Sequence, residues 1–148
     1  MAITAVQIAA PPERVFAYLS DLSRHGDWTA DPASIVAQDP SPIAPGKRYV
    51  STATFMGRQV VDQLEVTVVE GPRRFGFVAR APQAVVDHVF TLSAAASGTQ
   101  VERVTTVLAM ARWLKLAFPL VYLLVGKKSD ATSLGRLKAR LESGDAAA

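Results

Sequence analysis

Apolar and polar residues alternate through the middle of the chain, from Ile35 to Leu108. This period of two is typical of half-buried β-strands. The pattern predicts strands at residues 35–38, 47–56, 58–70, 73–80, 85–94 and 100–108. The breaks between them are short and rich in proline and glycine, as at Gly71-Pro72. Because such breaks leave no room for crossover helices, we expect an antiparallel sheet.

The start of the chain predicts one more strand and a short helix. Residues 2–9 suit a strand, and Pro11 and Pro12 end it because proline has no N–H to donate to a neighbouring strand. Proline also suits the first turn of a helix, and apolar spacing after it predicts one. A polar, turn-rich segment follows at residues 21–26, and we expect its His25 to be exposed to solvent.

The last predicted element is a long helix over roughly residues 111–142. Leucines and Trp113 recur there at steps of three and four and form one apolar stripe. Pro119 should kink the helix. The uninterrupted apolar run from Leu116 to Gly126 is about half of what a bilayer span requires, which excludes a transmembrane helix. This first half has more apolar faces than one sheet contact can cover, so part of it should face a ligand, a second subunit or lipid.

The excess of positive charge lies in the same helix. The chain has a net charge of +3 at pH 7, and residues 111–142 hold seven basic residues against two acidic ones. A nucleic-acid-binding protein usually has a denser basic stripe with interleaved aromatic residues, so we expect no nucleic-acid partner. The pattern fits either a solvated helix face or a surface for anionic lipid.

Length and composition limit the chain to one domain. Its 148 residues can close one hydrophobic core, and an apolar content of 49% excludes disorder as the main state. We expect a single domain over residues 1–142 and a flexible tail at residues 143–148. The absence of cysteine excludes disulfides and thiolate sites. No signal-peptide pattern opens the sequence, and we expect a cytoplasmic location.

Three stretches of the sequence carry a resemblance to a known family. They are Ala9-Ala10-Pro11-Pro12-Glu13-Arg14-Val15-Phe16 with Trp28 after it, Gly71-Pro72-Arg73-Arg74-Phe75, and Phe90-Thr91-Leu92 with Gly98-Thr99-Gln100-Val101. In these stretches the chain resembles the START-like or SRPBCC superfamily of polyketide cyclases/dehydrases, plant-allergen-type proteins and lipid-transport domains. The resemblance implies an α+β helix-grip fold. In that fold a curved antiparallel sheet of about seven strands wraps a long C-terminal helix, with two short helices after the first strand.

The resemblance also implies a pocket for a hydrophobic small molecule between the sheet and the C-terminal helix. We expect the pocket to be lined by Tyr49, Asp62, Leu64, Phe75, His88, Phe90, Arg103, Trp113, Leu116, Leu120 and Leu123. Tyr49 is included because its hydroxyl could reach a polar group of a ligand. Trp28 is expected in the core or at the rim.

Three ionisable side chains should enter this pocket from different strands. If Phe90 points inward, the two-residue period places His88 on the same face. The same reasoning carries Asp62 inward with Leu64, and brings Arg103 in from the last strand. A bulge of one residue would instead turn each of them to solvent. Polar groups that converge in an apolar pocket usually orient a ligand.

Three functions fit these features. The first is a carrier that binds an apolar metabolite such as a lipid, an isoprenoid or a polyketide. The second is a polyketide cyclase/dehydratase-like enzyme, in which His88 is the candidate acid or base and Asp62 or Arg103 assists. The third is an interaction module that docks on a membrane surface or pairs two subunits through the C-terminal helix. The chain would be a monomer or a homodimer.

No cofactor and no metal ion are expected. Two histidines, no cysteine and scattered carboxylates give no metal-ligand spacing. The glycine pattern of a dinucleotide-binding loop is absent, and so is the Gly-x-Ser-x-Gly turn of serine hydrolases.

Overall fold

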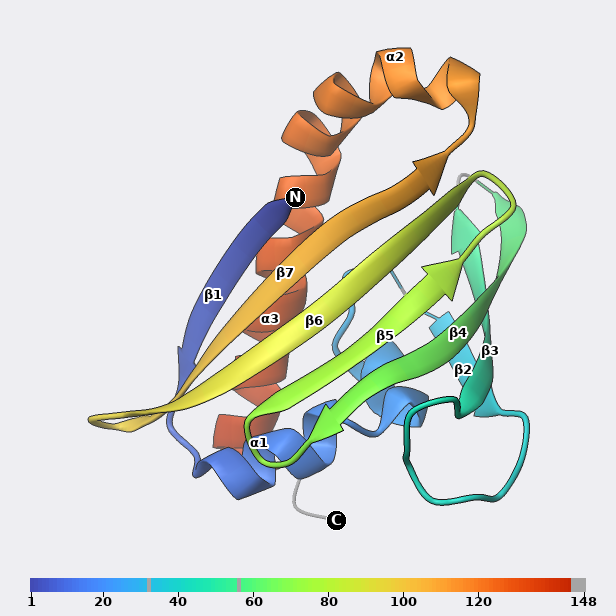
Figure 1. Ribbon diagram of the computed structural model, residues 1–148. Helices are drawn as coiled ribbons and strands as arrows, with labels where there is room; N and C mark the ends of the chain where they lie inside the picture. Colours follow the sequence, from blue (N-terminus) through green and yellow to red (C-terminus); the bar gives the residue numbers. More distant parts are fainter. Residues whose placement is uncertain (32, 56, 145–148) are drawn as a thin grey trace.

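A seven-stranded antiparallel sheet forms the body of the protein (Figure 1). The computed structural model describes residues 1–31, 33–55 and 57–144. The strands are β1 (Ala2–Ile8), β2 (Ala33–Ala37), β3 (Arg48–Phe55), β4 (Arg58–Glu70), β5 (Arg74–Arg80), β6 (Ala84–Ala95) and β7 (Gly98–Met110). Their order across the sheet is β1-β7-β6-β5-β4-β3-β2, so the first strand lies beside the last. Met56, the predicted end of one strand, lies outside the described residues.

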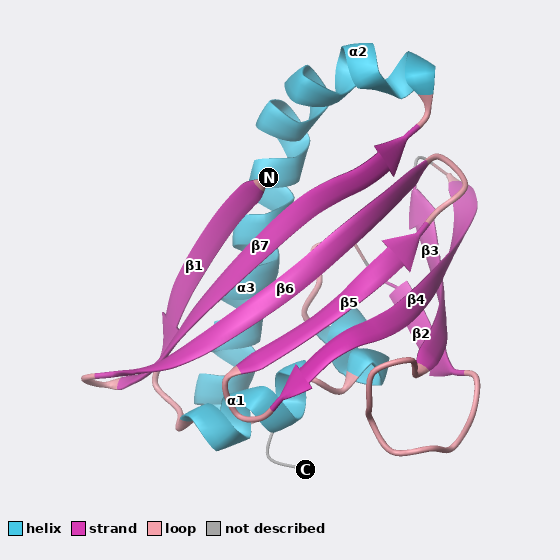
Figure 2. Cartoon of the chain, viewed as in Figure 1, coloured by secondary structure: helices cyan, strands magenta, loops and turns pink. Residues whose placement is uncertain are grey.

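The helices lie between β1 and β2 and after β7 (Figure 2). They are α1 (Pro12–Leu19), the 3-10 helix η1 (Leu22–Asp27), α2 (Arg112–Val121), the π-helical turn η2 (Tyr122–Gly126) and α3 (Lys127–Ser143). The predicted α+β helix-grip fold, with two short helices after strand 1 and a long C-terminal helix, is confirmed. Of the predicted tail, Ser143 belongs to α3 and residues 145–148 lie outside the described residues.

The two short helices begin where the sequence supplies the right residue types. Proline occupies the first turn of α1, where a missing N–H costs no helical hydrogen bond, and Glu13 follows it near the positive end of the helix dipole. Helix η1 begins after Asp21, whose carboxylate accepts a hydrogen bond from the backbone N–H of Ser23 at 3.1 Å. The two helices close one end of the hydrophobic core.

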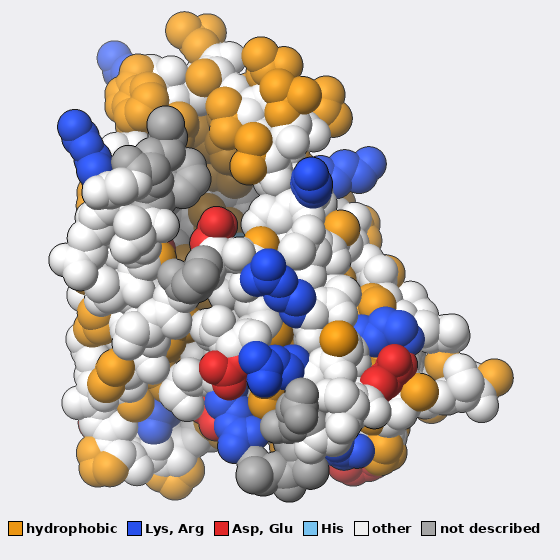
Figure 3. Space-filling view, turned by 180° about the vertical axis from the view of Figure 1, so that it is seen from behind, with side chains coloured by type: hydrophobic (Ala, Val, Ile, Leu, Met, Phe, Trp, Pro, Cys, Tyr) orange, Lys and Arg blue, Asp and Glu red, His pale blue; other side chains and the backbone are white. Residues whose placement is uncertain are grey.

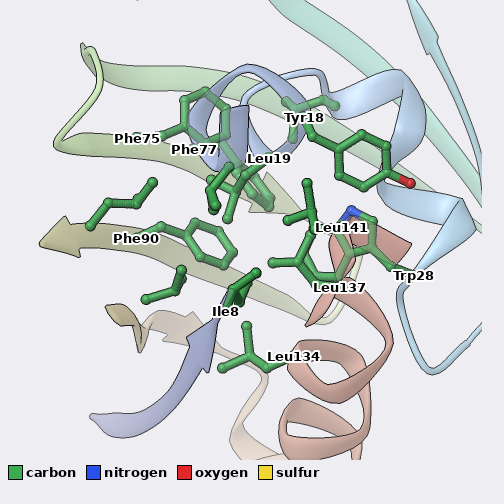
Figure 4. Packing of buried hydrophobic residues seen from close by; sticks show 14 of the residues in the cluster. Ile8, Tyr18, Leu19, Trp28, Phe75, Phe77, Phe90, Leu134, Leu137 and Leu141 are labelled. Carbon is green, nitrogen blue, oxygen red and sulfur yellow. The ribbon is translucent and has the colours of Figure 1, made fainter. Parts of the chain in front are cut away.

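The core lies between the sheet and helix α3 (Figure 4). Leu134, Leu137 and Leu141 recur at steps of three and four along α3, and all three are at most 1% exposed. They pack in one cluster with Phe75 and Phe90 from the sheet. The second half of the predicted apolar stripe therefore faces the sheet.

The first half of the C-terminal helix leaves the sheet. Pro119 lies inside α2, and in η2 the backbone N–H of Lys127 donates to the carbonyl of Tyr122, one residue further back than in an α-helix. Gly126 permits this turn, because a Cβ at that position would clash with the ring of Tyr122. Neither α2 nor η2 has a buried residue. Figure 1 shows α2 arching over the end of the sheet before the chain descends into α3.

Candidate functional site

A cavity of about 1110 Å³ opens on the side of the sheet that carries the core. This volume lies slightly above the range that is typical of small-molecule sites. Its wall is made by η1 and the loop after it, by the strands from β2 to β7, and by the β5–β6 loop. The lining residues include His25, Trp28, Ile35, Ser51, Asp62, Leu64, Phe77, Gln83, His88, Phe90 and Arg103.

The C-terminal helix does not form a wall of this cavity. Within the described part of the chain, no residue of α2, η2 or α3 lines it. We expected the pocket between the sheet and this helix, and the structure corrects that expectation. Because the helix bends away at η2, the side facing the strands is formed by η1 instead.

Five of the side chains expected in the pocket do line the cavity. They are Asp62, Leu64, His88, Phe90 and Arg103. The register shift in β4 lies between Val66 and Val68, beyond Leu64, so it does not turn Asp62 away. That these five residues contact a ligand stays a prediction, which binding experiments can test.

Two of the expected residues lie in the core and not on the cavity surface. Tyr49 is 4% exposed and Phe75 is fully buried. Both belong to the core cluster, and neither is among the residues that line the cavity. The alternation of a strand places a side chain on the inner face, but it does not tell whether neighbouring side chains cover it.

The other four, Trp113, Leu116, Leu120 and Leu123, point into solvent. Their exposed fractions run from 62% to 90%. In the sequence pattern these four residues share one stripe with Leu134 and Leu137, because the pattern assumes 3.6 residues per turn along the whole helix. One extra residue in the π turn rotates the preceding helix face by about 100° relative to that stripe. The placement of these four residues in the pocket is therefore corrected.

His25 is a cavity residue that the sequence reasoning missed. We expected it at the surface, but it is 3% exposed, and its Nε2 lies 2.7 Å from the carbonyl oxygen of Leu19. Its ring packs against Trp28 and Phe77, with centroids 4.5 and 5.5 Å away. Burial lowers the pKa of His25 to about 4. The signal was present: with Leu22 and Trp28 it repeats every three residues, the period of a 3-10 helix.

A buried ionic network begins at His88 and Arg103 on the cavity wall and continues behind it. Nη1 of Arg103 lies 3.1 Å from Oδ1 of Asp130 on α3, and both side chains are about one-eighth exposed, at 12% and 13%. The hydroxyl of Tyr122 donates to the other carboxylate oxygen at 3.1 Å. Nη2 of Arg103 lies 3.1 Å from Nδ1 of His88. The carboxylate compensates the guanidinium charge, so the network carries no net charge while His88 is neutral.

This network fixes the protonation state of His88. Burial, and then the charge of Arg103, hold the pKa of His88 well below its usual value, so the imidazole is neutral at pH 7. A guanidinium can only donate hydrogen bonds, so Nδ1 is the acceptor and the ring proton lies on Nε2. Within the described chain no side chain or carbonyl accepts from Nε2. His88 can therefore donate one hydrogen bond to a guest in the cavity.

Three further polar atoms on the wall have no hydrogen-bond partner within the described residues. They are Nε1 of Trp28, Oδ1 of Asp62 and Nε of Arg103. Buried polar groups are nearly always paired, so unpaired ones at a cavity indicate a place for polar ligand atoms. Burial also raises the pKa of Asp62.

Comparison with protein families matches residues 3–142 to the family described as polyketide cyclase / dehydrase and lipid transport. The chain belongs to this family. The resemblance drawn from the sequence is thereby confirmed. Comparison of this chain with curated proteins finds no match.

Solved structures share the fold over nearly the whole of this family member. Protein TTHA0849 from Thermus thermophilus matches with a TM-score of 0.76 and 21% identity, over 97% of both chains. Protein CV1439 from Chromobacterium violaceum matches with a TM-score of 0.72 and 17% identity, over 95% of this chain and 96% of its own. The di-domain ARO/CYC StfQ from the steffimycin biosynthetic pathway matches with a TM-score of 0.77 and 10% identity, over 99% of this chain and 51% of its own.

Among the residues that the structure describes, no group of three or more histidine, aspartate or glutamate side chains is arranged to hold a metal ion. No helix in the same part of the chain is long and apolar enough to cross a membrane.

Proposed function

We propose that this chain binds a small, largely apolar molecule that carries a neutral oxygen acceptor, such as a carbonyl group. The observation that carries the proposal is the cavity of about 1110 Å³ in which the neutral His88 ends the Asp130–Arg103 network. Aromatic rings of Trp28 and Phe90 supply apolar surface on the same wall. The family described as polyketide cyclase / dehydrase and lipid transport supports hydrophobic ligand binding in general.

The electrostatics of the wall favour a neutral ligand over a carboxylate. The cation of Arg103 is already compensated by Asp130 at 3.1 Å. His88 carries no charge at pH 7, because burial and Arg103 hold its pKa well below the usual value. A carboxylate would enter without a free cation to pair with, and burying an unpaired charge is costly. A carbonyl oxygen needs only the single N–H that His88 can donate.

A cyclase/dehydratase-like enzyme is less well supported than a binding protein. Nε2 of His88 could polarise a carbonyl, but proton abstraction also requires a base within reach of the proton on the neighbouring carbon. Asp62 pairs across the sheet with Ser51, whereas His88 pairs with Phe77 and Thr105, so the register does not bring the two side chains together. The carboxylate nearest to His88 in its network, Asp130, is held by Arg103 and Tyr122.

A matched pair of compounds tests the proposal. Fluorene and 9-fluorenone have the same ring skeleton, and only fluorenone carries a carbonyl group. We expect both to bind and to raise the melting temperature, as ligands that bind only the folded state do. Replacing His88 by Phe should weaken fluorenone binding about two- to tenfold and leave fluorene unchanged, because one neutral hydrogen bond is lost. In infrared spectra the carbonyl stretch of bound fluorenone should lie lower with wild type than with His88→Phe.

The control variant is Asp87→Asn, the neighbour of His88 on the opposite face of β6. It should leave the binding of both compounds unchanged. If neither compound binds wild type, the binding proposal is wrong. If both lose affinity equally in His88→Phe, the hydrogen bond is not the anchor. Chemical conversion of a carbonyl compound by the wild type, abolished in His88→Phe, would favour the enzyme instead.

A second candidate function is an interaction module on the first half of the C-terminal helix. The observation in its favour is a group of large apolar side chains on α2 and η2 that contact neither the sheet nor the cavity. This function is independent of the cavity, and both can belong to one protein. Together with a cytoplasmic location and a monomeric or homodimeric state, it remains a proposal.

A further inference from the structure

The helix segment formed by α2 and η2 exposes an unusual amount of apolar surface. We call the exposed group Trp113, Leu116, Leu120, Val121, Leu123, Leu124 and Val125 the apolar helix surface; its members are between 48% and 90% exposed. Figure 3 shows hydrophobic side chains gathered at this end of the molecule, with the surface hollowed below them. Exposed apolar patches of this kind mark interaction sites on soluble domains.

The charged side chains of residues 112–129 all have one sign. Arg112, Lys115, Lys127 and Lys128 are exposed, and residues 112–129 contain no aspartate or glutamate. Apolar side chains flanked by lysine and arginine are typical of helices that lie in the headgroup region of an anionic membrane. There the apolar side chains enter the acyl boundary and the cations pair with lipid phosphates.

We propose that the apolar helix surface docks on an anionic lipid membrane, with α2 and η2 lying along the interface. The segment spans 15 residues, Arg112–Gly126, or about 22 Å of helix, which is too short to cross a bilayer and long enough to lie on one. This inference names the partner for the second candidate function proposed above.

The same charges disfavour a second copy of the chain as the partner. In a two-fold dimer the same surface meets itself. Such a contact would bring the four cations of one copy toward those of the other, and neither segment offers an acidic residue to compensate them. Like charges across an interface cost affinity, whereas anionic headgroups supply the missing partner charge.

The docking segment begins at the rim of the cavity. The backbone N–H of Ala111, directly before α2, donates to the carbonyl of Gln83 at 2.9 Å, and Gln83 lines the cavity. A protein docked through this segment would hold the rim of its cavity close to the lipid. An apolar guest could then pass between membrane and cavity over a short path, a consequence that rests on the ligand-binding proposal.

Vesicle binding tests the proposal on the full chain. The protein is mixed with vesicles of phosphatidylcholine alone or of phosphatidylcholine with phosphatidylglycerol, and the bound fraction is measured by flotation. We expect binding to the vesicles with phosphatidylglycerol and weaker binding as salt is raised, because salt screens the headgroup charge. The emission of Trp113, which is 63% exposed, should shift to shorter wavelength on binding, whereas Trp28 is already buried.

Substitutions separate the apolar and the charged contributions. Leu116→Glu, at a residue 90% exposed, should lower the partition coefficient by about tenfold or more, since it removes a leucine from the acyl boundary and adds a negative charge. The double variant Lys127→Gln/Lys128→Gln should reduce the preference for phosphatidylglycerol. Val36→Glu is the matched control, because Val36 is 62% exposed on β2 at the far edge of the sheet.

Three outcomes would overturn the proposal. The first is that wild type binds neither vesicle, and the second is that Val36→Glu loses binding as much as Leu116→Glu. The third is a dimer in analytical ultracentrifugation that Leu116→Glu dissociates, without vesicle binding, which would assign the surface to a second copy. Fluorenone binding without vesicles reports on the cavity alone, so failure of the ligand-binding proposal remains distinguishable from failure of this one.

Discussion

The guanidinium of Arg103 on β7 and the carboxylate of Asp130 on α3 form a 3.1 Å ion pair inside the protein. We expect Asp130→Ala to reduce the free energy of unfolding by about 3–5 kcal/mol, because it leaves a buried cation without a partner. The double variant Arg103→Leu/Asp130→Leu should lose much less, since no charge stays buried. Urea denaturation measures both. Equal losses in the single and double variants would show that the pair does not act as a unit.

Burial of His25 should make the fold sensitive to acid. Its pKa is about 4 in the folded protein and near 6.5 when unfolded, so between these values the unfolded chain binds the proton more readily. The stabilisation is therefore complete above about pH 6.5 and is lost progressively toward pH 4, by about 3 kcal/mol in total. Urea denaturation at a series of pH values measures this, and His25→Gln should reduce the slope of the profile, while His88, whose pKa burial also lowers, maintains part of it. A wild-type profile that is level over this range would contradict the burial.

The two halves of the C-terminal helix should respond differently to the same substitution. Leu137 is fully buried and Leu116 is 90% exposed. We expect Leu137→Ala to cost about 2–5 kcal/mol of unfolding free energy, and Leu116→Ala to stay within about 0.5 kcal/mol of wild type. Thermal or urea unfolding compares them directly. A large loss in Leu116→Ala would show that α2 packs on the sheet in solution.

Binding of a neutral carbonyl ligand should not depend on pH near neutrality. The pKa of His88 is held well below its usual value, so its Nε2 proton and its charge stay constant between about pH 6 and pH 8. Fluorenone titrations across this range should give one dissociation constant. A change in affinity centred near pH 6.5 would show that His88 titrates normally and is exposed to solvent.

The fold could be predicted from the sequence because its local signals agree with one another. The alternation between Ile35 and Leu108 and the short breaks within it leave an antiparallel sheet as the solution. The same alternation placed His88 and Arg103 on the cavity face, because no bulge separates them from the buried Phe90 and Val101. Where the strand is regular, the face of a side chain follows from counting.

The remaining parts of the site depend on backbone features that residue types do not specify. The direction of Leu116 follows from the π turn η2, whose extra residue rotates the helix face, and no apolar pattern marks such a turn in advance. Likewise, Tyr49 is on the inner face of the sheet, but the side chains packed around it keep it off the cavity surface. Residue spacing along a strand or helix shows on which face a side chain lies, but it does not show which other side chains cover that face.

The arch of α2 and η2 touches little besides itself and the start of α3. Mutations at its exposed apolar positions therefore leave the walls of the cavity and the packing of the core largely as they are, whereas Tyr122 contacts Asp130 and belongs to the buried network. Over evolutionary time, homologous proteins can therefore change the sequence of this arch, and with it the surface to which they bind, while the ligand cavity stays the same.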